Sequence, residues 1–250
     1  MTDTLERRFE TDADAWDRSY DEQSPDAHRI QSRLDAALSL IGSGPGQVLD
    51  VGAGSGRLLT ALDNRGWTVH GVDPVPRMVE LARARIPDAA DRLLVGNAEK
   101  LPYADETFDV VAIIGVLEYT QVDVALAELG RVLRASGKAV IGLHGCRAPA
   151  TVWQRRVVLP IARRVKAVLP LGRPLPSATH GPVSLEEAID LLHQAGLIVE
   201  AMVRVGAQVI PDPFDRLAPA LAYRVARRVE RSPRLRRAFA TQRLIVARKA

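Results

Sequence analysis

Three glycines and two acidic residues stand at spacings that suit a nucleotide-type ligand. The segment VLDVGAGSG (48–56) ends an apolar run with Asp50 and then places glycines at positions 52, 54 and 56. Glycines allow the backbone to turn sharply, and they let a ligand approach main-chain N–H groups without a Cβ in the way. The pattern therefore predicts a small-molecule site at this loop.

The loop matches the fingerprint of dinucleotide-binding proteins, G-x-G-x-x-G/A, only in part. Counted from Gly52, the third small residue falls on Arg57, and counting from Gly54 fails as well. Because the small residue lets the helix pack closely on the strand, an arginine there disfavours a nicotinamide dinucleotide. A displaced helix could still accept a pyrophosphate, so the loop alone leaves the ligand open.

Asp73 is the second acid of the pattern. It follows Asp50 by 23 positions and ends the next apolar run, in HGVDPVPRM (70–78). A carboxylate there can accept hydrogen bonds from both hydroxyls of a ribose. The alternative is that Asp73 only caps the turn before Pro74. Because the glycine loop stands upstream at the expected distance, we favour ligand contact.

A sheet must bring these residues together. Short apolar runs rich in β-branched residues predict buried strands at 47–51, 67–72, 92–96, 108–114, 138–143, 198–204 and 243–249. Helix candidates alternate with the first five strands, at 57–64, 77–85 and 122–134. A further helix is opened by Ser184 and Glu187, a capping-box pattern. The alternation predicts an α/β fold with a parallel, doubly wound sheet.

In such a sheet the ligand lies outside the carboxyl ends of the strands. The residues to consider are therefore those at which strands end: Asp50 to Gly56, Asp73, Gly96 to Glu99, Gly115 to Tyr119, and His144.

Four sequence blocks, in this order and spacing, resemble the class I S-adenosylmethionine-dependent methyltransferases, especially the small-molecule branch that includes quinone-biosynthesis enzymes. The blocks are VLDVGAGSG, VDPVPRMVELAR, GNAEKLPYADETFDVV and IIGVLEYTQVDVALAELGRVLRASGKAVIG, and they cover about residues 46–143. The resemblance implies S-adenosylmethionine as cofactor. It also implies a Rossmann-like, seven-stranded sheet that is mostly parallel with an antiparallel last strand and helices on both faces.

The resemblance also implies where the cofactor lies. The ribose would meet Asp73, and Pro74, Val75 and Met78 would form an apolar wall beside it. The methionine part would meet Asp50, Gly52, Ala53, Gly54 and the Gly115 carbonyl. The adenine would meet Asn97, Ala98 and Glu99. An amino acid moiety at the loop needs no small residue at position 57. The family usually has Asp where Asn97 stands, and an Asn side-chain oxygen can still accept from the adenine amine.

Methyl transfer is an in-line displacement, so the protein mainly aligns the reactants and excludes water. A base is needed only if the acceptor must lose a proton early. The candidates are His144, just past a strand end, Glu118 and Tyr119 near the strand edge, and His180 in the following segment. The alternative for His144 is a histidine that satisfies its loop backbone. Glu118 is expected to start a helix. We expect no metal site.

Residues 1–42 are expected to form an N-terminal lid with a helix. AWDRSYDEQ (15–23) precedes an amphipathic stretch from about Asp26 to Ile41. In related enzymes such a segment folds over the cofactor, so Trp16 or Tyr20 would touch it. The alternative is that both aromatics pin the N-terminus to the domain.

Two segments outside the four blocks, 145–182 and 205–241, are expected to form substrate-side inserts of a single domain over 1–250. Residues 152–169 plot as an amphipathic helix kinked at Pro160, with arginines on one side. We favour a helix that packs on the domain over one that makes peripheral membrane contact. Both inserts could build an apolar pocket with a cationic rim.

The acceptor is therefore expected to be a small, apolar or anionic molecule, methylated on oxygen or nitrogen. A lipid-like or quinone acceptor at the membrane surface is the alternative, followed by an RNA methyltransferase or a non-catalytic cofactor-binding module. The net charge of +4 is local, and GVLEY (115–119) replaces the Asn/Asp-Pro-Pro-aromatic sequence of amino-group base modifiers. Because Cys146 also lacks a preceding proline, we do not expect nucleic acid as a partner.

Composition fits one globular domain, with 47% hydrophobic and 26% charged residues in 250. A lone cysteine, Cys146, cannot form an internal disulfide, and the N-terminus lacks an apolar signal core. No apolar run approaches the ~18 residues that span a bilayer. These features predict a cytoplasmic protein.

Overall fold

The computed structural model describes residues 3–145, 152, 156, 184–210, 215 and 218–250. Its strands are β1 (Gln47–Val51), β2 (Thr68–Asp73), β3 (Leu93–Val95), β4 (Phe108–Ile114), β5 (Leu133–His144), β6 (Leu197–Ala207) and β7 (Ala240–Lys249). Its helices are α1 (Asp3–Ser19), α2 (Pro25–Ile41), α3 (Arg57–Asp63), α4 (Pro76–Arg85), α5 (Val122–Val132), α8 (Leu185–Gln194), α9 (Pro219–Glu230) and α10 (Pro233–Phe239), with 3-10 turns η1 (Pro87–Arg92) and η2 (Leu117–Tyr119).

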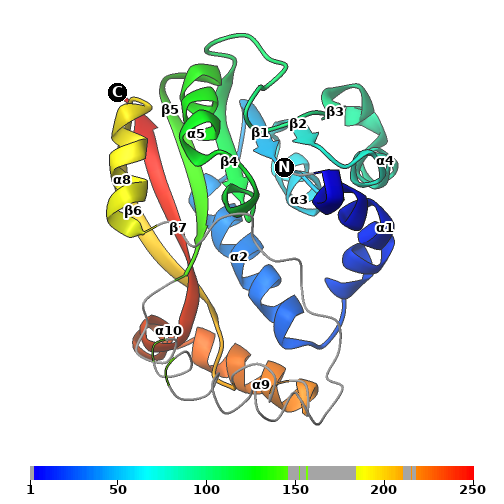
Figure 1. Cartoon of the computed structure of the whole chain (residues 1–250), viewed down its shortest axis with the longest axis vertical. Coiled ribbons are helices and arrows are strands. Elements are labelled where there is room, and N and C mark those ends of the chain that lie inside the picture. The colour runs from blue at the N-terminus through cyan, green and yellow to red at the C-terminus, as the bar shows by residue number, and fades with distance from the viewer. Residues whose placement is uncertain (1–2, 146–151, 153–155, 157–183, 211–214, 216–217) are drawn as a thin grey trace.

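The strands form one seven-stranded sheet in the order β3-β2-β1-β4-β5-β7-β6 (Figure 1). Neighbouring strands from β3 to β5 pair in parallel, whereas β7 pairs antiparallel with both β5 and β6. Strand order reverses between β1 and β4, which is where open α/β sheets bind ligands. The doubly wound, mostly parallel sheet with an antiparallel last strand is confirmed.

Helices cover both faces of the sheet, and successive residues of a strand serve opposite faces. In β1, Val48 packs with Leu59 and Leu62 of α3, while Leu49 packs with Leu126 of α5 on the other side. All five side chains are at most 1% exposed. A strand buried on both faces needs apolar side chains on both, which is why Val48, Leu49 and Val51 of β1 are apolar.

Two element boundaries differ from those expected. The helix predicted through Arg134 ends at Val132, and β5 begins at Leu133 because Leu133 pairs with Phe108 before the chain turns through Ser136 at φ 59°. The N-terminal segment, for which no helix was expected before about residue 26, forms α1. Helices of this length gain most of their stability from packing, and α1 packs on α4.

The second insert is described in part, and its described residues include α9 and α10. These helices connect the carboxyl end of β6 to the start of β7, so they lie at the same end of the sheet as the end of β5 (Figure 1). His180 lies outside the described residues, as does the helix predicted at 152–169 apart from Val152 and Arg156. The division of the chain into core and inserts stays a prediction. No described helix is long and apolar enough to cross a membrane.

Candidate cofactor and acceptor site

The glycine loop leads from β1 into α3 and leaves open space at one position. Gly52 has φ 76°, and a Cβ there would lie 2.1 Å from Cγ2 of Val116, so only glycine fits. Gly54, at φ 53°, has no atom within 4 Å of the position that a Cβ would take. Val116, just before η2, therefore fills the space beside Gly52, whereas the space beside Gly54 is free of protein atoms.

Asp73 ends β2 beside this open space. Its carboxylate accepts hydrogen bonds from the backbone N–H of Gly54, at 2.8 Å, and of Val75, at 2.9 Å. Asp73 thus caps its own turn and also holds the glycine loop, whereas its contact with a ligand stays a prediction. An ionised carboxylate can accept about four hydrogen bonds, so acceptor capacity remains for a ligand's hydroxyl groups. Burial raises the pKa of Asp73 to about 6, against the lowering effect of the two N–H donors.

Asp50 lies deeper, at the end of β1, and is only 4% exposed. Burial, together with the nearby charge of Asp73, raises the pKa of Asp50 to about 8. At neutral pH this carboxyl group therefore holds its proton in the unliganded protein. A cationic ligand group beside it would favour the ionised form.

Arg57, which spoils the dinucleotide fingerprint, begins α3 and points to α1. Close packing occurs one residue earlier, where a Cβ on Gly56 would lie 3.0 Å from Cβ of Ala82. Because the backbones approach each other at Gly56, position 57 can carry a long side chain. The Arg57 guanidinium donates to Asp17 at 2.9 Å and to Asp21 at 2.7 Å.

Asp17 of α1 joins the N-terminal segment to the glycine loop. Its carboxylate accepts from the Ser55 hydroxyl at 2.5 Å, from Arg57 at 2.9 Å and from Arg85 at 2.9 Å. Burial would raise the pKa of Asp17, but these donors outweigh it and hold the pKa at about 2. We call Asp17, Ser55, Arg57 and Arg85 the latch.

Apolar and aromatic side chains of α1, which lies beside α4 (Figure 1), contact both α4 and η2. Ala13 packs on Val75 and Met78, and the Phe9 ring contacts Tyr119 of η2 edge to face, with ring centroids 5.6 Å apart. Residues 3–19 are therefore placed as a lid that runs from α4 to η2.

Trp16 and Tyr20, the aromatic residues expected at the cofactor, contact each other, and Tyr20 also contacts Arg57. Tyr20 lies under the Arg57 guanidinium, 4.8 Å from it, and packs edge to face against Trp16. These contacts pin the segment to the domain. Contact of Tyr20, Pro74 or Met78 with the cofactor stays a prediction.

The three residues expected to meet the adenine, Asn97, Ala98 and Glu99, differ in their surroundings. Asn97 is exposed and Ala98 is 6% exposed, so both lie at the sheet edge as expected. The Glu99 carboxylate instead accepts from the backbone N–H of Gln121 at 3.1 Å, at the N-terminus of α5. That carboxylate therefore already has a structural partner.

A second polar cluster gathers at the end of β5 around His144. Nδ1 of His144 contacts the carboxylate of Glu118, and Nε2 lies 2.9 Å from the side-chain nitrogen of Gln242 and 3.4 Å from Nη1 of Arg33. The four residues come from β5, η2, β7 and α2, and His144 pairs directly with Gln242 in the sheet. Glu118 thus has a partner other than the helix start that was expected for it.

The two nitrogens of the His144 ring face different groups. Nδ1 faces the Glu118 carboxylate, which can only accept, and Nε2 faces the side-chain nitrogens of Gln242 and Arg33. Burial would raise the pKa of Glu118, but the contact with His144 outweighs it and lowers that pKa. The Glu118 side chain is 13% exposed and His144 is 40% exposed, so the histidine can meet a ligand while the carboxylate orients it from below.

Arg33 places a positive charge between the two clusters. A Cβ on Gly115 would lie 2.8 Å from Nη1 of Arg33, so the missing side chain makes room for the guanidinium. Within the described residues Arg33 forms no ion pair, and its buried Nε has no hydrogen-bond partner. An anionic group of a ligand would complement this cation.

The chain carries a methyltransferase domain. Residues 49–141 match the methyltransferase domain family. An uncharacterised methyltransferase of Mycobacterium tuberculosis is 39% identical over 92 residues, 37% of this chain and 37% of that protein. Demethylmenaquinone methyltransferase of Mycolicibacterium paratuberculosis is 33% identical over 139 residues, 53% of this chain and 58% of the relative. The match thus spans less than two thirds of either relative.

The fold is shared with solved structures over almost the whole chain. An S-adenosylmethionine-dependent methyltransferase from Thermotoga maritima superposes with a TM-score of 0.58 and 21% identity, covering 97% of this chain and 98% of that one. At this level of identity the likeness shows a shared fold, and it agrees with the match of residues 49–141 to the methyltransferase domain family and with the four sequence blocks.

Proposed function

We propose that the protein transfers a methyl group from S-adenosylmethionine to a small acceptor bound between the glycine loop and His144. The observation that carries the proposal is the arrangement of Asp73 beside Gly54. A buried carboxylate with free acceptor capacity faces open space in a glycine loop. A nucleoside with an amino acid tail fits this combination better than a pyrophosphate, because Arg57 and Arg85, the cationic side chains nearest the loop, are already paired with Asp17.

The chain's own residues would bind and orient the cofactor, which supplies an electrophilic methyl group when bound. Asp73 would accept from the ribose hydroxyls, and Asp50 would face the cationic end of the methionine part. The lid formed by α1 would exclude water, because desolvation strengthens the electrostatic interactions inside such a site. Asn97 and Ala98 would meet the adenine.

His144 would act as the base. The lone pair on Nε2 would accept a proton from an acceptor hydroxyl or amine that takes the place of the Gln242 amide, and Glu118 would stabilise the resulting imidazolium. Arg33, 3.4 Å from the same nitrogen, would stabilise the anion that forms on the acceptor. This supports O- or N-methylation of an acidic or anionic acceptor.

An apolar acceptor such as a quinone precursor is the second candidate. Its support is the named relative that acts on demethylmenaquinone, and a phenolic hydroxyl would satisfy the same His144 chemistry. The cytoplasmic location expected from the sequence and a small-molecule partner belong to the same proposal.

Turnover with fractionated cell extract tests the proposal without knowledge of the acceptor. We would incubate the full chain with methyl-labelled S-adenosylmethionine and with aqueous or organic-phase extract, and follow S-adenosylhomocysteine and labelled product. The proposal predicts turnover that depends on one fraction and is lost in His144→Asn. Binding of S-adenosylhomocysteine without turnover in any fraction would point to a non-catalytic module and overturn it.

A further inference from the structure

The strongest charge asymmetry of the described surface lies on α9 and α10. Residues 219–239 contain seven arginines and one acidic residue, Glu230. Glu230 points inward, where its carboxylate accepts from the backbone N–H of Ala207 at 2.7 Å and lies 3.8 Å from Nε2 of His28. The outer side of this helix pair therefore presents only positive charge.

These arginines differ from several arginines elsewhere on the surface. Arg77, Arg131 and Arg248 each pair with a carboxylate at 2.6 to 2.8 Å. By contrast, none of the α9 arginines forms an ion pair with any described residue; Arg224 donates to its own helix and Arg227 lies over the Tyr223 ring. Their charge remains available to an external anion.

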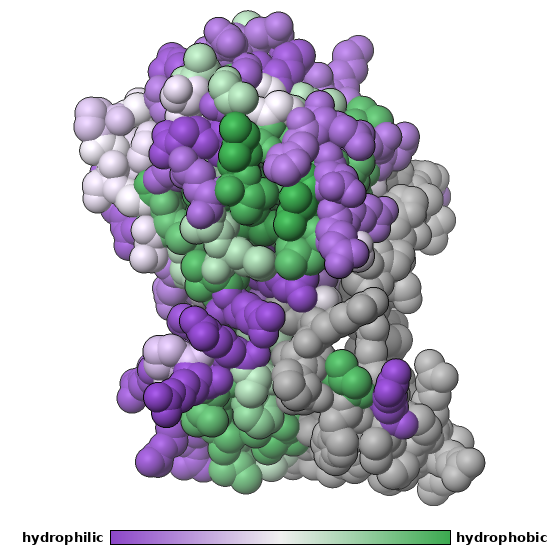
Figure 2. Space-filling model, turned by 90° about the vertical axis from the view of Figure 1, so that its left-hand side faces the viewer, coloured by the Kyte–Doolittle hydropathy of each residue, from purple (hydrophilic) through white to green (hydrophobic). Residues whose placement is uncertain are grey.

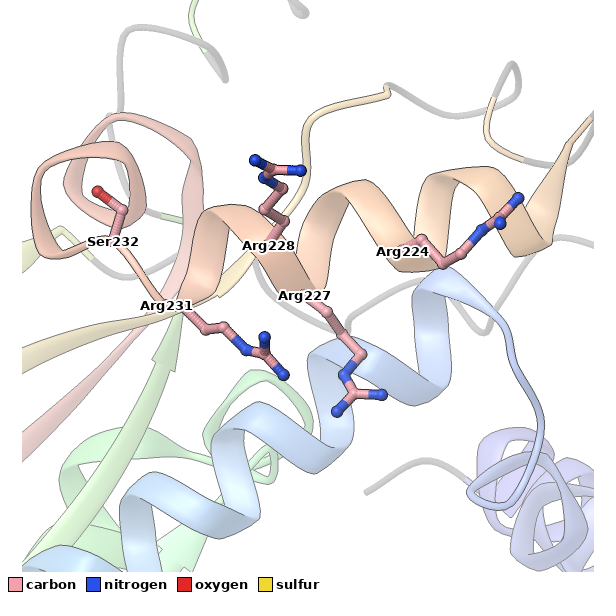
Figure 3. Close-up of a pocket in the computed structure, with 5 residues that line it drawn as sticks. All are labelled: Arg224, Arg227, Arg228, Arg231 and Ser232. Atoms are coloured by element: carbon pink, nitrogen blue, oxygen red, sulfur yellow. The ribbon is translucent and has the colours of Figure 1, made fainter.

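The residues of this surface follow the helix period. Leu221, Arg224, Arg227 and Arg228 of α9 are exposed, as is Arg231 just after the helix, while Ala222 and Ala226 are buried. Figure 3 shows the arginine side chains spread along the helix, with Arg228 on one side of the ribbon and Arg227 and Arg231 on the other. Together with Ser232 they line a shallow, open hollow.

Exposed leucines accompany the charges. Leu221 on α9 is 49% exposed and Leu235 on α10 is 47% exposed. Figure 2 shows hydrophobic and strongly hydrophilic side chains side by side at the lower end of the molecule, where α10 lies in Figure 1. Arginines around exposed leucines are the composition of a surface that lies in the headgroup region of a bilayer.

We infer that α9 and α10 form a docking surface for a membrane rich in anionic lipids. The hollow is too open to enclose a free anion. The exposed face also lacks the aromatic residues on which nucleic-acid bases stack, since Tyr223 packs against His28. The outer arginines would bind lipid phosphates, and Leu221 and Leu235 would enter the acyl boundary.

The location of this surface connects it with the candidate site. Phe239, the last residue of α10, lies three positions before Gln242, which contacts His144. A docked molecule would thus present the carboxyl end of the sheet to the membrane. This inference does not depend on the proposed methyl transfer.

Flotation of the full chain with lipid vesicles tests the docking surface. We would use phosphatidylcholine vesicles with and without about one third phosphatidylglycerol, at low and high salt. Binding is expected only to the anionic vesicles, and high salt should weaken it. Arg228→Gln combined with Arg231→Gln should lower the partition coefficient about tenfold or more.

The matched control combines Arg7→Gln with Lys100→Gln, which removes two exposed charges from α1 and from the segment after β3. It should leave vesicle binding within about twofold. Leu235→Ser should weaken binding without changing its salt dependence. Equal binding to neutral vesicles, equal losses in both double variants, or binding of RNA in place of vesicles would each overturn the inference.

Discussion

The two halves of the candidate site are built in different ways. The cofactor half, around Gly54 and Asp73, comes from consecutive strand ends, and its key contact is a backbone N–H held by one carboxylate. The acceptor half, around His144, draws one side chain from each of four elements. The first half is thus defined by backbone geometry, whereas the second depends on how distant side chains pack. Substitutions around Asp73 should therefore change cofactor binding, whereas substitutions around His144 should change catalysis.

The largest effect is expected in the acceptor half. His144→Asn removes the base, so turnover should fall by about 10²- to 10⁴-fold, while the dissociation constant for S-adenosylhomocysteine stays within a few fold. Turnover would be measured with the extract fraction that supports it. The matched control is His193→Asn, an exposed residue of α8.

Glu118→Gln sharpens the same test. It keeps a hydrogen-bond partner at Nδ1 but removes the negative charge, so turnover should fall less than in His144→Asn. A variant of either residue that lost cofactor binding together with turnover would contradict the separation of the two halves.

The lid should control cofactor exchange. Asp17→Asn weakens the latch at Ser55, Arg57 and Arg85, so S-adenosylhomocysteine should dissociate about tenfold faster. Stopped-flow displacement would measure this rate. Asp14→Asn is the control, because its pair with Arg77 is 50% exposed on the carboxylate side and should matter little. Equal rates in both variants would show that α1 does not gate the site.

A smaller effect concerns the pH dependence of cofactor affinity. The pKa of Asp73 is raised to about 6, and the ionised form is the one that accepts from two ribose hydroxyls. Affinity for S-adenosylhomocysteine should therefore fall as the pH is lowered through 6, by about tenfold. Affinity that is constant over this range would argue against ribose contact.

The smallest effect is on stability. The pKa of Asp50 is raised from 3.8 to about 8, so the folded state keeps a proton that the unfolded chain loses near pH 4. The contribution of Asp50 to the free energy of unfolding therefore declines as the pH rises from about 4 to about 8. Asp50→Asn should melt a few degrees higher than the native protein above pH 8, with the difference shrinking toward pH 4. Calorimetry would detect the opposite trend if Asp50 were ionised in the folded state.

The sequence predicted that Asp50, Gly54 and Asp73 lie together because their signals are local. Strand ends, glycine spacing and Asp73 are read from neighbouring residues, and the predicted sheet brings them to one edge. The contact that Asp73 makes with the Gly54 N–H follows directly from that placement. The close packing of Gly56 on Ala82 was not foreseen, although it explains why Arg57 is tolerated.

In the acceptor half, only His144 and Glu118 were among the candidates that the sequence offered. Arg33 stands within an ordinary amphipathic pattern and Gln242 opens a strand, so neither carries a local signal. Glu118 looked like a helix-start residue because its neighbour in space, His144, is 26 positions away in the chain. The latch was missed for the same reason, since Asp17 and Arg57 meet only after α1 folds over the loop.

Calorimetric titration of S-adenosylhomocysteine into the native protein and into Asp73→Ala tests the central claim most directly. Asp63→Ala, an exposed residue of α3, serves as the control, and NADH as the competing ligand. The account predicts one binding site in the native and control proteins, an affinity at least about tenfold lower in Asp73→Ala, and no binding of NADH. Unchanged affinity in Asp73→Ala, or binding of NADH in place of S-adenosylhomocysteine, would contradict it.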